Sequence, residues 1–340
     1  MSGISTTPLR IGILGTAHIA RGFVQGVRPS THVSVTAVAS RDAAKARAFA
    51  DEFAIGRHFG SYEALLADGD IDAVYVPLPN GLHAEWSIAA ARAGKHVLCE
   101  KPLAASAEEA RAMFGAARKH SVHVVEAYPY RVQPQTLKLR ELLDAGVIGE
   151  LRLIQASFGF TLGEAENIRL DPQLAGGALM DVGSYPVSLV RMAAKARPIR
   201  VQAAAQWTNR GVDRTLAATL IHAGGLHAQI SCSFSTCVYR QALIAGSNGV
   251  IQTTFLNHTT PSQAVMQLRV GTDKDAVDSV VQTAGTNGFL AEAESFERLV
   301  RQGPAAWQGA TPQESIDIVL TIEAILKSAH SGIAVDIPAD

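Results

Sequence analysis

The first 125 residues alternate between short apolar segments and alanine-rich segments, and this alternation constrains the fold more than any other feature. β-Branched and other apolar residues fill short runs at 9–14, 33–40, 73–76, 96–99 and 122–126. Helical periodicity occupies the intervals at 19–27, 43–53, 62–67, 84–93 and 107–119. Strands that are apolar almost throughout are typical of parallel sheets covered on both faces. The pattern therefore predicts an α/β domain built from βαβ units around a parallel sheet.

The first apolar run leads directly into a glycine turn, Gly15-Thr16-Ala17-His18-Ile19-Ala20, which opens a predicted helix. The turn follows the G-x-G-x-x-G/A fingerprint, with alanine in place of the second glycine. A glycine turn can be incidental, but this one lies at a strand-to-helix junction in the first βαβ unit. Helix N-termini at such junctions bind the pyrophosphate of a dinucleotide. We therefore expect a Rossmann domain in which the cofactor contacts Gly15, Thr16, Ala17, His18 and Ile19.

The second apolar run ends in Ser40-Arg41-Asp42, where NAD-binding domains usually carry an acidic residue. A hydroxyl followed by a guanidinium suits a ribose 2′-phosphate, through charge-assisted hydrogen bonds. Ser40 and Asp42 could instead cap the next helix, and the two roles are compatible. The segment favours NADP(H) as the cofactor and leaves NAD(H) possible.

Four motifs spread along the chain carry a family resemblance: GILGTAHIA at 12–20, PNGLH at 79–83, GKHVLCEKP at 94–102 and GGALMDVGSY at 176–185. With them the chain resembles the glucose–fructose oxidoreductase / inositol dehydrogenase / rhizopine catabolism (Gfo/Idh/MocA) family, over essentially its whole length. The resemblance implies that Lys101 lies beside the nicotinamide and contacts the reacting substrate oxygen. Alternatively, Lys101 is a surface lysine paired with Glu100, and His83 caps or packs against a helix. The residues expected at the cofactor's nicotinamide side are Pro77, Asn80, His83, Glu100 and Lys101.

Asp181 and Tyr185 are four residues apart, so on a helix both can face one cleft. Pro186 could kink or restart that helix. The tyrosine makes the chain similar to the subgroup with glucose–fructose oxidoreductase, dihydrodiol dehydrogenase, aldose dehydrogenases and sugar 3-ketoreductases. The resemblance implies that Tyr185 donates or accepts the proton with help from Lys101, while Asp181 orients substrate hydroxyls. Tyr185 could also be a half-buried aromatic residue whose hydroxyl is merely satisfied.

After about residue 127, strand-like runs crowd together and short turns such as 223–225 and 246–249 separate several of them. Such turns favour antiparallel neighbours and predict an α+β domain with a large, mainly antiparallel open-faced sheet. We expect a nucleotide-binding domain at 1–127 and a substrate-binding and oligomerisation domain at 128–340. The resemblance implies a homodimer or homotetramer formed through that sheet. If Val201, Ala203 and Ala205 lie on its open face, that face must be covered.

Composition excludes several other classes of protein. The 30 basic and 31 acidic residues give a net charge of −1, so no overall field attracts nucleic acid or an anionic membrane. Cys99, Cys232 and Cys237 have no metal-ligand spacing with the histidines, and no metal site is predicted. The sparse cysteines, a polar N-terminus without signal-peptide character and no apolar run of about 20 residues indicate a cytoplasmic protein.

Together these features predict an NADP(H)-dependent oxidoreductase that moves a hydride to or from a polyhydroxylated substrate. The leading substrate is a sugar, oxidised by an aldose dehydrogenase or reduced by a keto-sugar reductase. One alternative is a trans-dihydrodiol dehydrogenase, and another is a non-catalytic NADP-binding sensor.

Overall fold

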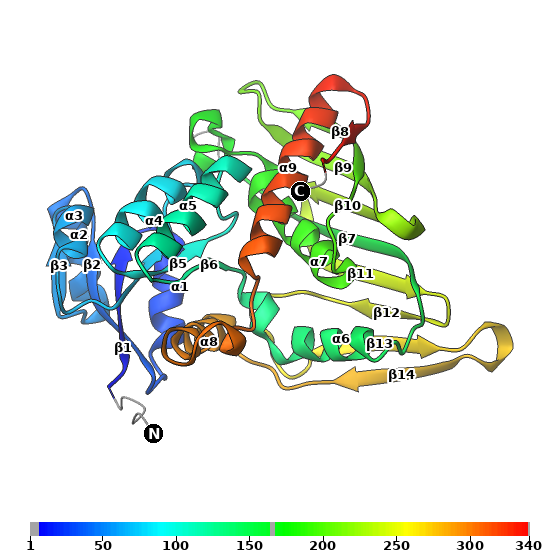
Figure 1. Cartoon of the computed structure of the whole chain (residues 1–340), viewed down its shortest axis with the longest axis horizontal. Helices are drawn as coiled ribbons and strands as arrows, with labels where there is room; N and C mark the ends of the chain where they lie inside the picture. The colour runs from blue at the N-terminus through cyan, green and yellow to red at the C-terminus, as the bar shows by residue number, and fades with distance from the viewer. Residues whose placement is uncertain (1–6, 164–166, 339–340) are drawn as a thin grey trace. The chain divides into compact units, whose positions relative to one another are not determined.

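The computed structural model describes residues 7–163 and 167–338, and the chain forms two compact units. One contains the chain up to Val132 together with Asn287–Pro312, and the other contains Gln133–Thr286 together with the chain from Gln313 onward. Figure 1 shows the elements of each unit. No helix in the described ranges has both the length and the apolar character that crossing a membrane requires.

The first unit is built on a six-stranded parallel sheet in the order β3-β2-β1-β4-β5-β6. Its strands are β1 (Leu9–Leu14), β2 (Val33–Ala39), β3 (Arg57–Phe59), β4 (Ala73–Val76), β5 (His96–Glu100) and β6 (Val124–Ala127). Its helices are α1 (His18–Val27), α2 (Ala43–Phe53), α3 (Tyr62–Leu66), α4 (His83–Arg92), α5 (Ala107–Lys119) and α8 (Gly288–Gln302). Because the strand order reverses between β1 and β4, the carboxyl ends of these strands form the switch point at which such sheets bind ligands.

Aromatic packing ties α8 to this sheet. Phe23 of α1 stacks on Tyr75 of β4 with ring centroids 4.1 Å apart, and it meets Phe289 of α8 edge-on at 5.9 Å. Phe289 belongs to the same buried cluster as the apolar residues of β1. A side chain at Gly26 of α1 would collide with Phe289, so glycine allows the two helices to approach closely. The chain therefore returns to the first unit after it has formed strands β7 to β14 of the second sheet.

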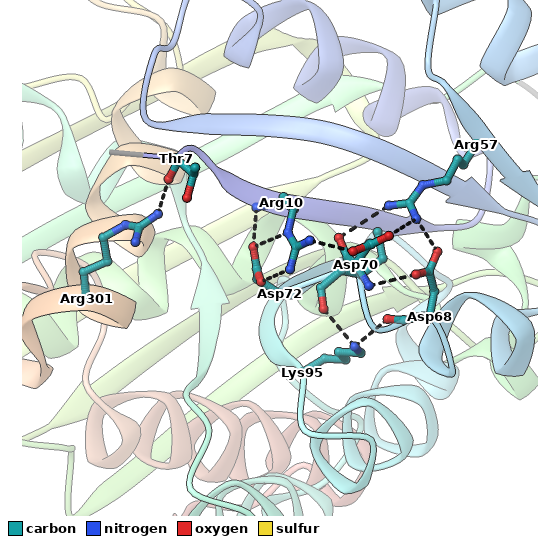
Figure 2. A network of polar contacts seen from close by, with 9 residues as sticks. Thr7, Arg10, Arg57, Asp68, Asp70, Asp72, Lys95 and Arg301 are labelled. Carbon is teal, nitrogen blue, oxygen red and sulfur yellow. Dashed lines mark hydrogen bonds and ion pairs between the residues drawn. The ribbon is translucent and has the colours of Figure 1, made fainter. Parts of the chain in front are cut away.

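A network of charged side chains holds the amino end of the parallel sheet (Figure 2). Arg10 forms a two-point contact with Asp72, at 2.7 and 3.0 Å. Lys95 is buried and donates to the carbonyl oxygens of Asp68 and Ile71, at 2.7 and 2.8 Å. These side chains lie at the strand ends opposite the switch point, so their charges serve the fold of the loop before β4.

The second unit is built on a nine-stranded sheet in the order β14-β13-β12-β11-β7-β10-β9-β8-β15, antiparallel except for the parallel pair β7 and β10. Its strands are β7 (Leu151–Thr161), β8 (Arg200–Trp207), β9 (Asp213–Ile221), β10 (His227–Ser233), β11 (Ser235–Gly246), β12 (Gly249–Thr253), β13 (Val265–Val270), β14 (Val277–Gln282) and β15 (Val335–Asp336). Its helices are α6 (Pro134–Asp144), α7 (Ser184–Ala194) and α9 (Pro312–Ser331). The first residue of α9, Pro312, is counted with the first unit. The predicted fold class is confirmed.

The three helices lie on one face of the nine-stranded sheet (Figure 1). Gln135 of α6 donates to Thr253 of β12 at 3.0 Å, and Ser328 of α9 accepts from the backbone of Ala203 in β8 at 3.0 Å. Val201 and Ala203 are buried on this side, whereas Gln202 and Ala204 are exposed on the other. The apolar alternation of β8 thus packs against helices. The open face holds a hollow of about 960 Å³ lined by glutamine, serine, threonine and small apolar residues, without a charged side chain among them.

Candidate active site

The glycine turn lies at the carboxyl end of β1. Gly15 has φ +105°, and its N–H donates to Ala39 at 2.8 Å. A Cβ at Gly15 would lie only 3.0 Å from the Leu78 side chain, so glycine is required both for the conformation and for the space. Helix α1 then begins at His18 without a side-chain cap. Its first N–H groups are the unpaired donors that bind an anion, and exposed His18 and Ile19 leave access to them.

At the end of β2 both sequence interpretations find support. Asp42 caps α2 by accepting from the N–H groups of Ala44 and Lys45, at 2.9 and 3.2 Å, and Ser40 accepts from the Asp42 N–H at 3.2 Å. Arg41 remains exposed beside them. A capping role for Asp42 leaves the Arg41 guanidinium available to a phosphate.

Tyr62 of α3 connects Arg41 to the glycine turn, and the sequence analysis did not predict this residue. Burial raises the pKa of Tyr62, and the Arg41 guanidinium, which forms a hydrogen bond with the phenol, opposes part of that shift. The same hydroxyl lies 3.7 Å from the position of a Cβ on Gly15. The donors of the turn and the Arg41 cation therefore meet at one edge of the sheet. This arrangement fits a dinucleotide that carries an additional ribose phosphate.

His83 joins two loops that the sequence analysis assigned to the cofactor. Its ring is fully buried, with Nδ1 2.8 Å from the Pro102 carbonyl and Nε2 2.8 Å from the Leu78 carbonyl. Burial lowers the pKa of His83 to about 4, so the ring is neutral at pH 7 and donates to one of the two carbonyls. His83 thus positions the loop of Pro77 and Asn80 against the turn after Lys101. A direct contact between its ring and a cofactor stays a prediction.

Glu100 is a buried carboxylate behind Lys101. It accepts from the Tyr75 hydroxyl at 2.6 Å and from the Lys101 N–H at 3.2 Å. Both contacts fix the end of β5, from which Lys101 emerges half-buried. Burial raises the pKa of Glu292 on α8 well above its ordinary value, and the nearby Glu100 adds to this shift. Both effects favour the neutral form of the Glu292 carboxyl beside Glu100.

In the second unit, Asp181 lies on a π-helical turn, Leu179–Gly183, that continues into α7, and Tyr185 lies in the first turn of α7. Pro186 is the third residue of α7, and the helix continues through it to Ala194. Arg169 donates to Asp181 at 2.6 Å. The Arg169 carbonyl accepts from the N–H of Gly177 at 2.8 Å, which holds the preceding loop against the glycine pair.

Asp213, at the start of β9, anchors the N-terminus of this turn. It is buried and accepts from the Leu179 N–H at 2.7 Å. Gly177 has φ +119°, and a Cβ there would overlap the Asp213 carboxylate. Burial raises the pKa of Asp213 to about 6, although the N–H groups of Leu179 and Ala178 favour its ionised form. The second glycine of the motif is therefore required by this close contact.

Tyr185 has an environment that the sequence analysis did not predict. Its side chain is 4% exposed, and its hydroxyl accepts from the Asn257 amide at 2.9 Å. Its ring meets Phe158 edge-on at 5.5 Å, and the Arg240 guanidinium carbon lies 4.3 Å from its centroid. Arg240 on β11 and Asn257 in the loop after β12 come from sequence far beyond the recognised motifs. Within the described residues, His, Cys, Asp and Glu form no group of three or more that could hold a metal ion.

Two family models match the chain. The model described as "Oxidoreductase family, NAD-binding Rossmann fold" matches residues 9–128, and the "GFO/IDH/MocA C-terminal domain" matches residues 136–252. The fold and this match define an NAD(P)-dependent oxidoreductase. The chain belongs to the Gfo/Idh/MocA family, as its motifs indicated, and the predicted nicotinamide cofactor is confirmed.

Individual relatives span the chain. A D-xylose 1-dehydrogenase (NADP(+)) of Haloferax volcanii is 40% identical over 332 residues, covering 97% of this chain and 100% of that protein. A trans-1,2-dihydrobenzene-1,2-diol dehydrogenase of Mus musculus is 37% identical over 247 residues, covering 72% of this chain and 74% of that protein. A solved 3-ketoreductase from Actinomadura kijaniata, in complex with NADP and TDP-benzene, has a TM-score of 0.84 and 31% identity and covers 94% and 98% of the two chains.

Proposed function

We propose that the protein is an NADP(H)-dependent oxidoreductase that interconverts a secondary alcohol or hemiacetal and the corresponding carbonyl group on a sugar. The observation that carries this proposal is the setting of Tyr185, a buried phenol with a donor on its oxygen and a cation on its ring. Nucleotide binding requires no such phenol, which argues against a non-catalytic sensor.

The chain's own residues divide the work of binding. Gly15, Thr16, Ala17, His18 and Ile19 hold the pyrophosphate, and Ser40 and Arg41 hold the 2′-phosphate. Pro77, Asn80 and Glu100 shape the nicotinamide side. When bound, the nicotinamide supplies or accepts the hydride.

Tyr185 and Lys101 act on the reacting oxygen of the substrate. In the oxidative direction Tyr185 accepts the hydroxyl proton on its Oη, and in the reductive direction it returns that proton. The Lys101 ammonium stabilises the negative charge that develops on the substrate oxygen. Asp181, held by Arg169, accepts hydrogen bonds from neighbouring substrate hydroxyls. Structures of the 3-ketoreductase relative include a Lys→Ala and a Tyr→Phe variant, both with TDP-benzene and NADP. These variants support the choice of a lysine and a tyrosine as the residues that act on the substrate.

Relatives favour a sugar and name the second candidate. The D-xylose dehydrogenase aligns over almost the whole chain, whereas the dihydrodiol dehydrogenase aligns over about three quarters of it. A trans-dihydrodiol therefore remains the alternative substrate.

An absorbance screen with NADP⁺ and NADPH tests the proposal. Aldoses, keto-sugars, inositols and trans-dihydrodiols are offered to the wild type, with Lys101→Ala as the blank. We expect turnover with an aldose or keto-sugar, and Tyr185→Phe should lower kcat by roughly 100-fold. Turnover of dihydrodiols alone supports the alternative. Tight NADPH binding without any turnover indicates the sensor, and near-normal Tyr185→Phe turnover moves the proton transfer to another group.

We also propose that two copies pair through the open face of the nine-stranded sheet. The uncharged lining of its hollow supports this, because the cores of protein interfaces are depleted of charged residues. The three free cysteines support a reducing, cytoplasmic location.

A further inference from the structure

We propose that Arg240 and Asn257 favour the ionised form of the Tyr185 hydroxyl and are therefore positioning residues for proton transfer. The proposal rests on the proposed function, in which Tyr185 exchanges the proton with substrate. It adds the residues that make a phenol suited to that exchange near neutral pH.

Sheet register fixes the position of the Arg240 cation. Arg240 on β11 lies directly opposite Phe158 on β7, and its guanidinium carbon is 3.8 Å from the Phe158 ring centroid. The same guanidinium lies 4.3 Å from the Tyr185 centroid. Its Nη1 donates to the Phe255 carbonyl at 2.9 Å and to Asn257 Oδ1 at 3.1 Å. The Phe158 ring and two hydrogen-bond acceptors therefore hold the Arg240 charge over the phenol ring.

The Arg240 contact determines the orientation of Asn257. A guanidinium can only donate, so Asn257 must present its carbonyl oxygen to Arg240. Its amide nitrogen is then left to donate to the Tyr185 oxygen, 2.9 Å away. The backbone of this loop is held by buried Gln133, which donates to the carbonyls of Leu256 and Asn257 and accepts from Thr259 at 2.8 Å.

Both contacts stabilise the phenolate more than the phenol. A donor on the oxygen favours the charged form, and a nearby cation attracts its negative charge. Tyr185 is buried, so water screens these interactions weakly. In substrate oxidation the alcohol O–H bond breaks, its proton passes to Tyr185 Oη, and the hydride leaves the carbon for the oxidised nicotinamide. The electrons and atoms balance without another reactant.

The elements that pack against the helix of Tyr185 carry several other titratable groups. Asp181 is paired with Arg169, and Asp213 accepts from the backbone. Burial raises the pKa of the Cys232 thiol on β10 well above its ordinary value, so that group is neutral. Tyr239 precedes Arg240, and exposed His258 follows Asn257. Lys101 is the further cation, which the proposed function places at the reacting oxygen of the substrate.

A substrate-free titration tests the inference directly. The ultraviolet absorbance of tyrosinate is followed with pH in each protein and in its Tyr185→Phe counterpart, and the difference isolates Tyr185. We expect Arg240→Met to raise the midpoint by about one pH unit or more, which corresponds to about 1.4 kcal/mol per unit. Arg240→Lys should restore part of the shift, because it keeps the charge but not the planar contact. Arg269→Met is the matched control, since exposed Arg269 lies on the same sheet and pairs with Asp278.

Asn257→Asp tests the second contact and does not depend on how well Arg240→Met folds. A carboxylate has no N–H for the phenolate and adds a repelling charge, so the midpoint should rise again. In the wild type, kcat for alcohol oxidation should rise with pH as Tyr185 ionises. In the variants this rise should move to higher pH by the same amount as the titration, while KM changes less than threefold, within roughly 0.6 kcal/mol.

The outcomes separate this inference from the proposed function. An unchanged Tyr185 midpoint in Arg240→Met, Arg240→Lys and Asn257→Asp overturns the inference, even if the enzyme oxidises sugars. A shifted midpoint in a protein that turns over no substrate supports the inference and rejects the proposed function.

Discussion

Arg41 is the residue on which the proposed preference for NADP(H) depends. It is exposed at the carboxyl end of β2, beside Ser40, and its guanidinium forms a hydrogen bond with the Tyr62 phenol. A phosphate at this position gains charge-assisted hydrogen bonds, whereas a free ribose hydroxyl gains little from a guanidinium. We therefore propose that the preference for NADP(H) depends on this side chain more than on the fold.

Replacing Arg41 with aspartate should invert the preference. Loss of hydrogen bonds to a charged group costs about 2–3 kcal/mol, so the Kd for NADPH should rise roughly 100-fold. NADH should bind as well as before or better, because a carboxylate accepts from the ribose hydroxyls. Cofactor fluorescence titration measures both constants. Arg47→Asp, on the exposed side of α2, is the control, and equal losses for NADPH and NADH would defeat the assignment.

At the scale of elements, sequence periodicity predicted the helices and strands that bury one face or both faces. The strands β1 and β4 and the helices α2 and α5 have the bounds that their sequence patterns indicated. The edge strand β14 was not predicted, because almost all of its residues are exposed and its sequence lacks a buried alternation. The contacts of Tyr185 with Arg240 and Asn257 were missed for a different reason. They depend on register between strands distant in sequence, which no local pattern encodes.

Asp213 determines how the element that carries Tyr185 begins, and its effect on stability should depend on pH. Its folded pKa of about 6 lies above the ordinary value of 3.8, so the folded protein binds its proton more tightly than the unfolded chain does. Stability from this group is therefore present below about pH 4 and declines as pH rises to about 6. The full decline is on the order of 3 kcal/mol.

Asp213→Asn should remove that decline. The free energy of unfolding, measured with urea at pH 4.5 and pH 7, should change less with pH in the variant than in the wild type. Asp213→Ala should also lose the cap on Leu179, at a cost of about 1–2 kcal/mol at either pH. Exposed Asp275→Asn is the control. If the free energy of unfolding depends on pH in the same way in the wild type and in Asp213→Asn, the Asp213 carboxyl has the same pKa in the folded and unfolded states.

At the scale of the whole chain, charge is distributed by function. The arginines, aspartates and lysine in Figure 2 hold the amino end of the parallel sheet, and the charges proposed to act on ligands lie at the other strand ends or beside Tyr185. The open face of the nine-stranded sheet has no charge in its hollow, where cross-strand pairs such as Gln155–Gln229 and Ser157–Ser231 bond to each other. Such a face can be buried without leaving a charged side chain unpaired and away from water.

A charge placed in the hollow should therefore prevent assembly. The protomer has a mass of 35.9 kDa, and light scattering after gel filtration should give at least twice that value for the wild type. Ala217 is exposed within the hollow, so Ala217→Glu would bury two carboxylates at a symmetric interface and should yield monomers at micromolar concentration. Ala48→Glu, on the exposed face of α2, should leave the mass unchanged. A wild type that is monomeric, or an Ala217→Glu variant that assembles normally, would place any interface elsewhere on the chain.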